Sequence, residues 1–164
     1  MQRINWPPDP NTTGTAPIGV ANAKVDYLIV NGRKWLRATS TGKGDVHAEY
    51  ALSGSQLPPA GSYHVHANAY AQKAGALFIV FVRVNGSYQQ PLNVPVGDGQ
   101  TVTVDRTITI PAGCSQLIVR IGPNNQTVGA IGMMSDILIE HADTYDAVGG
   151  GLPGFFTGDT MPLA

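Results

Sequence analysis

The sequence has little charge, a single cysteine and no long apolar run. Charged residues make up 13% of the 164 residues and the formal net charge is −1. The basic surface that nucleic-acid binding requires is therefore missing, and we expect no nucleic-acid partner. Cys114 has no second cysteine with which to form an internal disulfide. No stretch approaches the roughly 18 apolar residues of a membrane span, so we expect no membrane insertion.

Several sequence motifs of enzymes and secreted proteins are also missing. The first ten residues, MQRINWPPDP, lack the apolar segment of a signal peptide. There is no nucleophile-elbow motif, phosphate-binding loop or zinc pattern. Asp105, Asp136 and Glu140 are acids that a hydrolase could use, but nothing in the sequence pairs them across a cleft. We therefore expect no catalytic residue, no enzyme activity and no cofactor.

Turn residues and short alternating runs are abundant. The chain has 20 glycines and 12 prolines, and the Asn31-Gly32 and Asn85-Gly86 pairs predict type I′ hairpins. Roughly eight to ten short strands joined by short turns predict an all-β protein, an antiparallel β-sandwich of the jelly-roll type. We expect an extended arm over residues 1–17, the sandwich over residues 18–142, and a flexible, irregular, aromatic-tipped tail over residues 143–164.

Side-chain parity predicts the burial of individual strands. Residues 76–84 are apolar on both parities, which predicts a strand covered on both faces. Pro91 and Pro95 predict either an edge strand or a loop. Arg106 interrupts an inward parity, which predicts either a β-bulge or a snorkelling side chain. The residues that parity places in the core are Phe78, Val80, Val82, Ile108, Val119, Ile137 and Ile139.

The last long run, from Gly129, predicts a closing strand. Its apolar residues share one parity, and Asp136 and Glu140 fall on the other. A strand with this alternation buries one face and exposes the other. We therefore expect both acids to face solvent. The apolar residues are Ile131, Met133, Ile137 and Ile139.

A histidine pair raises the question of a metal site. His64 and His66 lie two residues apart on one expected strand, so both imidazoles share a face. If the preceding strand lies beside it, Asp45, His47 and Glu49 could join them and hold a divalent metal. We favour a solvated polar face and expect no metal.

Tyrosine rings next to amides predict a shallow carbohydrate site. We expect Tyr70 and Tyr88 to contact a ligand, with Asn68 and Gln90 beside them. The rings that we expect to fill the core or to decorate the strands are Trp35, Tyr50 and Tyr63.

The two ends of the chain carry large rings on segments with no regular period. Trp6 could dock the arm on this sandwich or on a neighbouring subunit, and Phe155 and Phe156 tip the tail. Exposed rings are a liability for a free monomer. We therefore expect all three to be assembly contacts in a homo-oligomer.

Two stretches resemble known families. The strand pattern that ends in SDILIE resembles the jelly-roll carbohydrate-binding modules that accompany glycoside hydrolases. The tail, DAVGGGLPGFFTGDTMP, is similar to the stretch that ends such a domain in minor tail proteins of phages infecting actinobacteria. In those proteins the sandwich is followed by an aromatic-Phe-x-Gly-Asp-Thr-x-Pro sequence. The matching residues are Phe155, Phe156, Gly158, Asp159, Thr160 and Pro162.

The resemblance implies a structural virion protein of the phage tail or tail tip, assembled in the cytoplasm of the host bacterium. It implies contact with other virion tail proteins and with host-surface glycan, and no enzyme activity. By resemblance to other tail-tip proteins we favour a trimer. The alternative interpretation is a free-standing carbohydrate-binding module.

Overall fold

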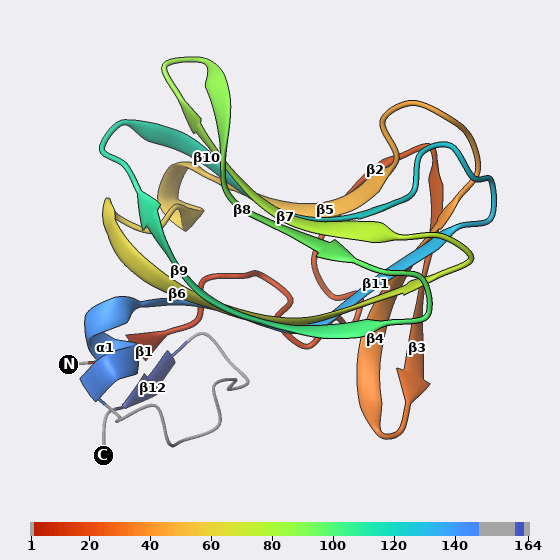
Figure 1. Cartoon of the computed structure of the whole chain (residues 1–164). Coiled ribbons are helices and arrows are strands. Elements are labelled where there is room, and N and C mark those ends of the chain that lie inside the picture. The colour runs from red at the N-terminus through yellow and green to blue at the C-terminus, as the bar shows by residue number, and fades with distance from the viewer. Residues whose placement is uncertain (1, 148–159, 163–164) are drawn as a thin grey trace.

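Two five-stranded antiparallel sheets pack face to face, as the stacked ribbons of Figure 1 show. The computed structural model describes residues 2–147 and 160–162. We name each sheet after its central strand. The β10 sheet has the order β2 (Gly19–Ala21), β5 (His47–Ser53), β10 (Cys114–Pro123), β7 (Ala76–Val84) and β8 (Ser87–Val96). The β11 sheet has the order β3 (Ala23–Val30), β4 (Arg33–Ser40), β11 (Ile131–His141), β6 (Gly61–Gln72) and β9 (Thr101–Ile110).

The remaining elements are short. β1 (Gln2–Ile4) pairs with β12 (Thr160–Pro162), and a 3₁₀ turn, η1, spans Gly54–Gln56. An α-helix, α1, spans Ala142–Ala147, and the Thr144 hydroxyl donates a hydrogen bond of 2.9 Å to the carbonyl of His141 at its start. The all-β sandwich is thus confirmed, whereas the irregular tail expected from residue 143 is wrong over these first residues.

Both Asn-Gly hairpin turns are confirmed by their backbone conformation. The φ angles are 51° at Asn31 and 76° at Gly32, and 50° at Asn85 and 79° at Gly86. Two successive positive φ angles define the type I′ turn, whose twist matches that of the strands on either side.

The core lies between the sheets and follows the predicted parity. All seven residues assigned to it are buried, with exposed fractions of 3% or less. The rings of Tyr50 and Tyr63 also lie in this core, as expected for inward-facing positions.

The predictions for three individual strands had mixed outcomes. β8, which holds Pro91 and Pro95, is an edge strand as expected. β7 is not covered on both faces, because it lies one strand from the edge and its outward Leu77 is 40% exposed. The β6–β9 register runs without interruption past Arg106, so the bulge is wrong there. Arg106 instead lies exposed on the edge strand, which fits the snorkelling alternative.

The single parity predicted for the closing strand is wrong, because β11 contains a bulge. Its register with β6 shifts between Ser135 and Leu138, and Asp136 has a φ of 50°. Before the bulge Met134 faces the core and Met133 faces outward; after it Ile137 and Ile139 face the core. An extra residue reverses the side-chain alternation, which strand periodicity alone does not reveal.

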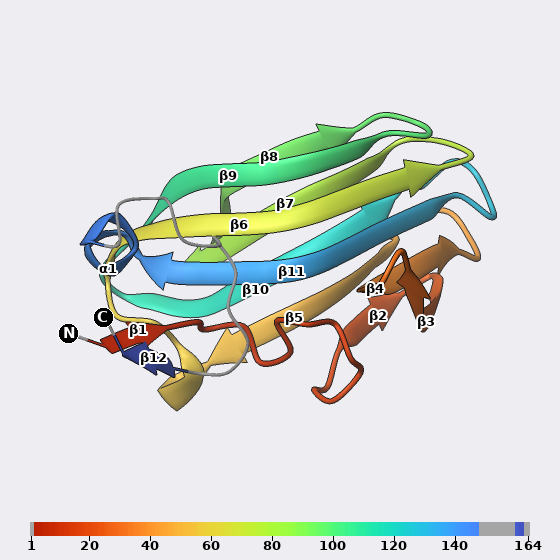
Figure 2. The same ribbon diagram turned by 90° about the horizontal axis from the view of Figure 1, so that it is seen from below.

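The N-terminal arm docks on this sandwich, along the edge of β11 that β4 leaves free (Figure 2). Trp6 N donates to the Ile139 carbonyl at 3.1 Å, and Ile137 N donates to the Pro10 carbonyl at 3.0 Å. The Asn5 amide accepts from Ile139 N and donates to the Ile137 carbonyl, each at 3.0 Å. The arm thus pairs with β11 much as a further strand would.

Glu140 is buried rather than exposed, because this arm brings Arg3 to it. Two guanidinium nitrogens of Arg3, Nε and Nη2, each donate to a carboxylate oxygen of Glu140 at 2.6 Å. The exposed fractions of the two residues are 1% and 0%. The expectation that Glu140 faces solvent is therefore wrong, since its partner lies at the other end of the chain.

Candidate functional site

The outer face of the β10 sheet is the hollow side of the sandwich. In Figure 1 both sheets bow in the same direction, and the β7–β8 turn and the loop before β5 rise at opposite ends of this face. Outward positions of β5, β10 and β7 form its floor. The inward positions of the same strands fill the core, so the alternation of β-strands sets which side chains are available to a ligand.

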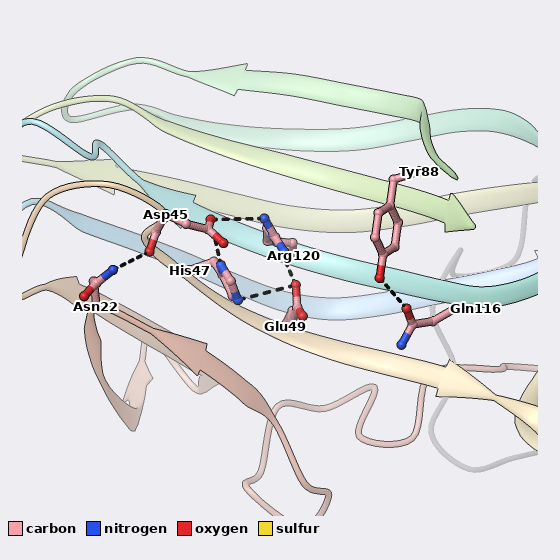
Figure 3. Close-up of polar contacts among 7 residues, drawn as sticks. All are labelled: Asn22, Asp45, His47, Glu49, Tyr88, Gln116 and Arg120. Carbon is pink, nitrogen blue, oxygen red and sulfur yellow. Dashed lines mark hydrogen bonds and ion pairs between the residues drawn. The ribbon is translucent and has the colours of Figure 1, made fainter. Parts of the chain in front are cut away.

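A connected ionic cluster lies across β5 and β10 (Figure 3). Arg120 donates from Nε to Glu49 Oε2 at 2.7 Å and from Nη1 to Asp45 Oδ1 at 3.3 Å. His47 lies between the same two acids, with Nδ1 3.0 Å from Asp45 and Nε2 3.7 Å from Glu49. Asn22 donates from its amide to the Asp45 carbonyl at 2.8 Å. Each member holds its neighbour in place, which pre-organises donors and acceptors on this face.

Two aromatic rings continue the face toward β8. Tyr88 is 53% exposed and packs edge-on against Phe81, with ring centroids 6.2 Å apart. Its hydroxyl donates to Gln116 Oε1 at 2.9 Å, as Figure 3 shows. Arg120 lies over the Phe81 ring, 4.7 Å from its centroid, and so joins the rings to the ionic cluster.

A cavity of about 430 Å³ lies beside Arg120, toward the opposite end of the strands. Leu77, Ile79 and Gly122 contribute an apolar surface, and Asn124 and Asn125 contribute amides. The face therefore offers an exposed ring at one end, charged groups in the middle and a cavity at the other.

A second cavity lies on the outer face of the β11 sheet. It has a volume of about 630 Å³ and lies under the β3–β4 hairpin, which hangs below that sheet in Figure 1. Trp35 and Tyr70 are among its lining residues, with Arg33 and Arg37 at β4. We call it the hairpin groove. Its volume exceeds that of the Arg120 cavity, but it lacks an exposed ring comparable to Tyr88.

The four predicted ligand residues fall on two opposite faces. Tyr88 and Gln90 lie on β8, exposed on the β10 sheet, whereas Tyr70 and Asn68 lie on β6 in the β11 sheet. Asn68 is only 5% exposed, and its amide bonds to Asp136 and Thr103 inside the structure. The structure thus separates the candidates into two pairs and leaves Asn68 without access to a ligand.

Sequence reasoning did not identify the other residues of the Tyr88 face and of the hairpin groove. We expect Trp35 to fill the core or to decorate a strand, yet it lines the hairpin groove. Its outward parity, opposite to that of Leu36 and Ala38, was the available signal. Phe81 and Arg120 gave no comparable signal, because their proximity depends on the pairing of β7 with β10.

The condition for a face shared by the histidine pair and the carboxylates is not met, because the two strands lie in different sheets. β5 carries His47 and Glu49 in the β10 sheet, while β6 carries His64 and His66 in the β11 sheet. His64 instead stacks on Tyr145 of α1, with ring centroids 3.6 Å apart. Burial lowers the pKa of His66, and the nearby Asp105 carboxylate only partly opposes this. Within residues 2–147 no group of three or more His, Cys, Asp or Glu side chains is arranged to hold a metal ion.

The three acids considered for hydrolysis are held by separate partners. Glu140 bonds to Arg3, Asp136 lies 2.8 Å from Nε of Arg33, and Asp105 lies 2.5 Å from Nε2 of His64.

No helix in the described part of the chain is long and apolar enough to cross a membrane.

The predicted assembly contacts are only partly within the described residues. Trp6 is half-buried and packs against the core of its own chain. Phe155 and Phe156 lie outside the described residues. A role of these rings in oligomer assembly stays a prediction.

Comparison with solved structures identifies the fold. The CBM22-1 xylan-binding domain from Paenibacillus barcinonensis Xyn10C is 15% identical, with 84% of this chain and 91% of that chain covered and a TM-score of 0.59. The C-terminal family 22 module of Clostridium thermocellum Xyn10B, whose cleft residues were studied for their role in ligand binding, is 14% identical, with coverages of 87% and 94% and a TM-score of 0.59. The chain has the fold of carbohydrate-binding modules.

A third similar structure is TmCBM61 in complex with β-1,4-galactotriose. It is 16% identical, with 82% of this chain and 97% of that chain covered and a TM-score of 0.54. Scans against protein-family models and curated proteins gave no match. At these identities the similarity establishes the carbohydrate-binding-module fold and leaves the ligand to be argued from the site.

Proposed function

We propose that this module binds a glycan on the outer face of the β10 sheet. The observation that carries the proposal is the alignment of the exposed Tyr88 ring, Phe81 and the Arg120 cluster on one hollow face. A sugar ring has apolar C–H faces and polar hydroxyls at its rim. Rings with pre-organised polar groups beside them suit such a ligand, because both kinds of surface are satisfied together.

The polar groups of this face can donate hydrogen bonds to the hydroxyls of an uncharged sugar and accept hydrogen bonds from them. Arg120 has five N–H donors, of which the contacts to Glu49 and Asp45 use Nε and Nη1. The carboxylates of Asp45 and Glu49 accept, and the amides of Asn124 and Asn125 do both. Arg120 pairs with Asp45 and Glu49, and Arg83 lies over the Tyr88 ring, so this surface carries two arginines and two acids. This balance favours a neutral glycan, and the proposed role is binding without catalysis.

The first test is Tyr88→Ala. We expect the affinity for an oligosaccharide such as xylohexaose or β-1,4-galactotriose to fall about tenfold, equivalent to about 1.4 kcal/mol, because the main stacking ring is lost. Isothermal titration calorimetry would measure it. Tyr27→Ala is the matched control, since Tyr27 is a 38% exposed tyrosine on the other sheet. Equal affinity for the wild type and Tyr88→Ala would contradict the site.

For the biological setting we propose a phage tail, with the module as a minor tail or tail-tip component that contacts host-surface glycan and assembles as a trimer in the bacterial cytoplasm. The support is the tail sequence from Phe155 to Pro162, of which only Thr160–Pro162 lies in a described strand. A free-standing carbohydrate-binding module agrees equally well with the fold. Mass spectrometry of purified particles should detect peptides of this chain, and their absence would favour the free-standing module.

A further inference from the structure

The hairpin groove lies on the opposite side of the sandwich from the Tyr88 face, and its residues come from different strands. At about 630 Å³ it falls within the range of small-molecule sites, about 300–1,000 Å³. The β3–β4 hairpin forms one wall, and β11 and β6 form the floor. A site here would therefore be independent of the one proposed above.

The floor of the groove carries a row of apolar and polar side chains that includes the accessible ring of Tyr70. Strand pairing places Arg37, Met133 and Tyr70 side by side on three adjacent strands, with Thr101 next in line on β9. Tyr70 is half-buried and so offers part of its ring to the groove. Gln72 lies two residues further along the same strand and lines the same cavity. Apolar and hydrogen-bonding groups thus alternate within a short distance.

Trp35 is also in the groove, but its ring is covered. Its exposed fraction is 6%, and the guanidinium carbon of Arg33 lies 5.8 Å from the ring centroid. Arg33 is held over the ring by Asp136, at 2.8 Å. The side chain of Arg33 is itself 44% exposed, and an ion pair this exposed is weak, about 0–1 kcal/mol. The cover can therefore be displaced at small cost.

Charge decides the class of ligand. Each arginine in the groove has its own acid: Arg33 has Asp136, and Arg37 donates from Nε to Asp26 Oδ1 at 2.7 Å. Hydrogen bonding by Arg37 lowers the pKa of Asp26, so this carboxylate stays ionised. The groove is thus electrically balanced, and a phosphate or carboxylate would gain no unpaired cation.

We propose that the hairpin groove is a second carbohydrate site, for a neutral sugar unit that stacks on Tyr70 and bonds to Arg37 and Gln72. Arg33 moves off Trp35 when the sugar enters. The module would then hold glycan on both outer faces of the sandwich.

Trp35 supplies a direct readout of this site. The chain has two tryptophans, so Trp6→Phe leaves Trp35 as the only one. Titration of the Trp6→Phe protein with xylohexaose and with β-1,4-galactotriose should give a saturable change in Trp35 emission with at least one of them. Tyr70→Ala in this background should weaken that change at least tenfold, while Tyr88→Ala should leave it unaltered.

The outcomes separate the two sites. Constant Trp35 emission with both sugars overturns the second site, even where calorimetry still detects Tyr88-dependent binding. Loss of the Trp35 change in Tyr88→Ala also overturns it, because a single site would then explain both signals. Tighter binding of an oligogalacturonide than of either neutral sugar overturns the assignment to a neutral ligand.

One further variant tests the cover without any sugar. Arg33→Ala in the Trp6→Phe background should increase acrylamide quenching of Trp35 about twofold or more. Lys34→Ala, which removes a neighbouring cation that lines a different cavity, should not. Unchanged quenching in Arg33→Ala contradicts the cover, and this measurement stays informative where Tyr70→Ala fails to fold.

Discussion

Replacing Arg3 with alanine is expected to lower the free energy of unfolding by about 3–5 kcal/mol. The substitution leaves the Glu140 carboxylate buried without its guanidinium partner, and Glu140 is 0% exposed. It also removes an attachment of the arm to β11. Urea-induced unfolding followed by circular dichroism would measure the loss.

Arg37→Ala is the control for this prediction. Arg37 also bonds to a carboxylate, that of Asp26, but both side chains are exposed by more than a third. The expected loss is therefore about 0–1 kcal/mol. The double replacement Arg3→Met with Glu140→Leu should recover much of the stability, because it removes both buried charges. Equal losses in Arg3→Ala and Arg37→Ala would refute the role of burial.

Asp9→Ala is expected to cost about 2–4 kcal/mol, because several hydrogen bonds converge on one carboxylate. Oδ1 accepts from Thr13 N at 2.9 Å and from the Thr13 hydroxyl at 2.8 Å. Oδ2 accepts from Gly14 N at 2.8 Å and from the buried Tyr50 hydroxyl at 3.0 Å. Tyr50→Phe, which removes a single donor, should cost only about 1 kcal/mol in the same denaturation assay.

The contribution of Asp9 should also depend on pH. Burial raises the pKa of Asp9, but the hydrogen bonds from Thr13, Gly14 and Tyr50 outweigh it and lower the pKa below its ordinary value. The unfolded value is about 3.9, so the stabilisation is fully present above that pH and is lost as the pH falls through the folded pKa. Asp9→Asn should show a smaller loss of stability below about pH 4 than the wild type. Identical acid profiles would contradict this.

The alternation of apolar and polar residues predicted most of the sandwich, because it shows which face of each strand is buried. The Asn-Gly turns and the core residues, such as Phe78 and Val80, could be predicted from neighbouring residues in the sequence alone. The bulge at Asp136 could not be predicted in this way, since it is an irregularity in the pairing of β11 with β6. The burial of Glu140 could not either, because it requires a partner 137 residues away.

The candidate site was predictable residue by residue but not as an arrangement. Tyr70 and Tyr88 were identified from ring chemistry, but nothing local indicates that β6 and β8 belong to different sheets. Phe81 and Arg120 became recognisable only when strand pairing placed them on the Tyr88 face. Sequence supplies the candidate groups, whereas sheet order decides which of them meet.

The N-terminal arm has a consequence for solubility. The second half of β11 pairs with β6 on one side but has no partner in β4 on the other, where the backbone groups of Ile137 and Ile139 would be free without the arm. A free strand edge of this kind is a template on which a second copy can add its own strand and start aggregation. By occupying that edge with Asn5, Trp6 and Pro10, the arm keeps copies of the module from joining edge to edge.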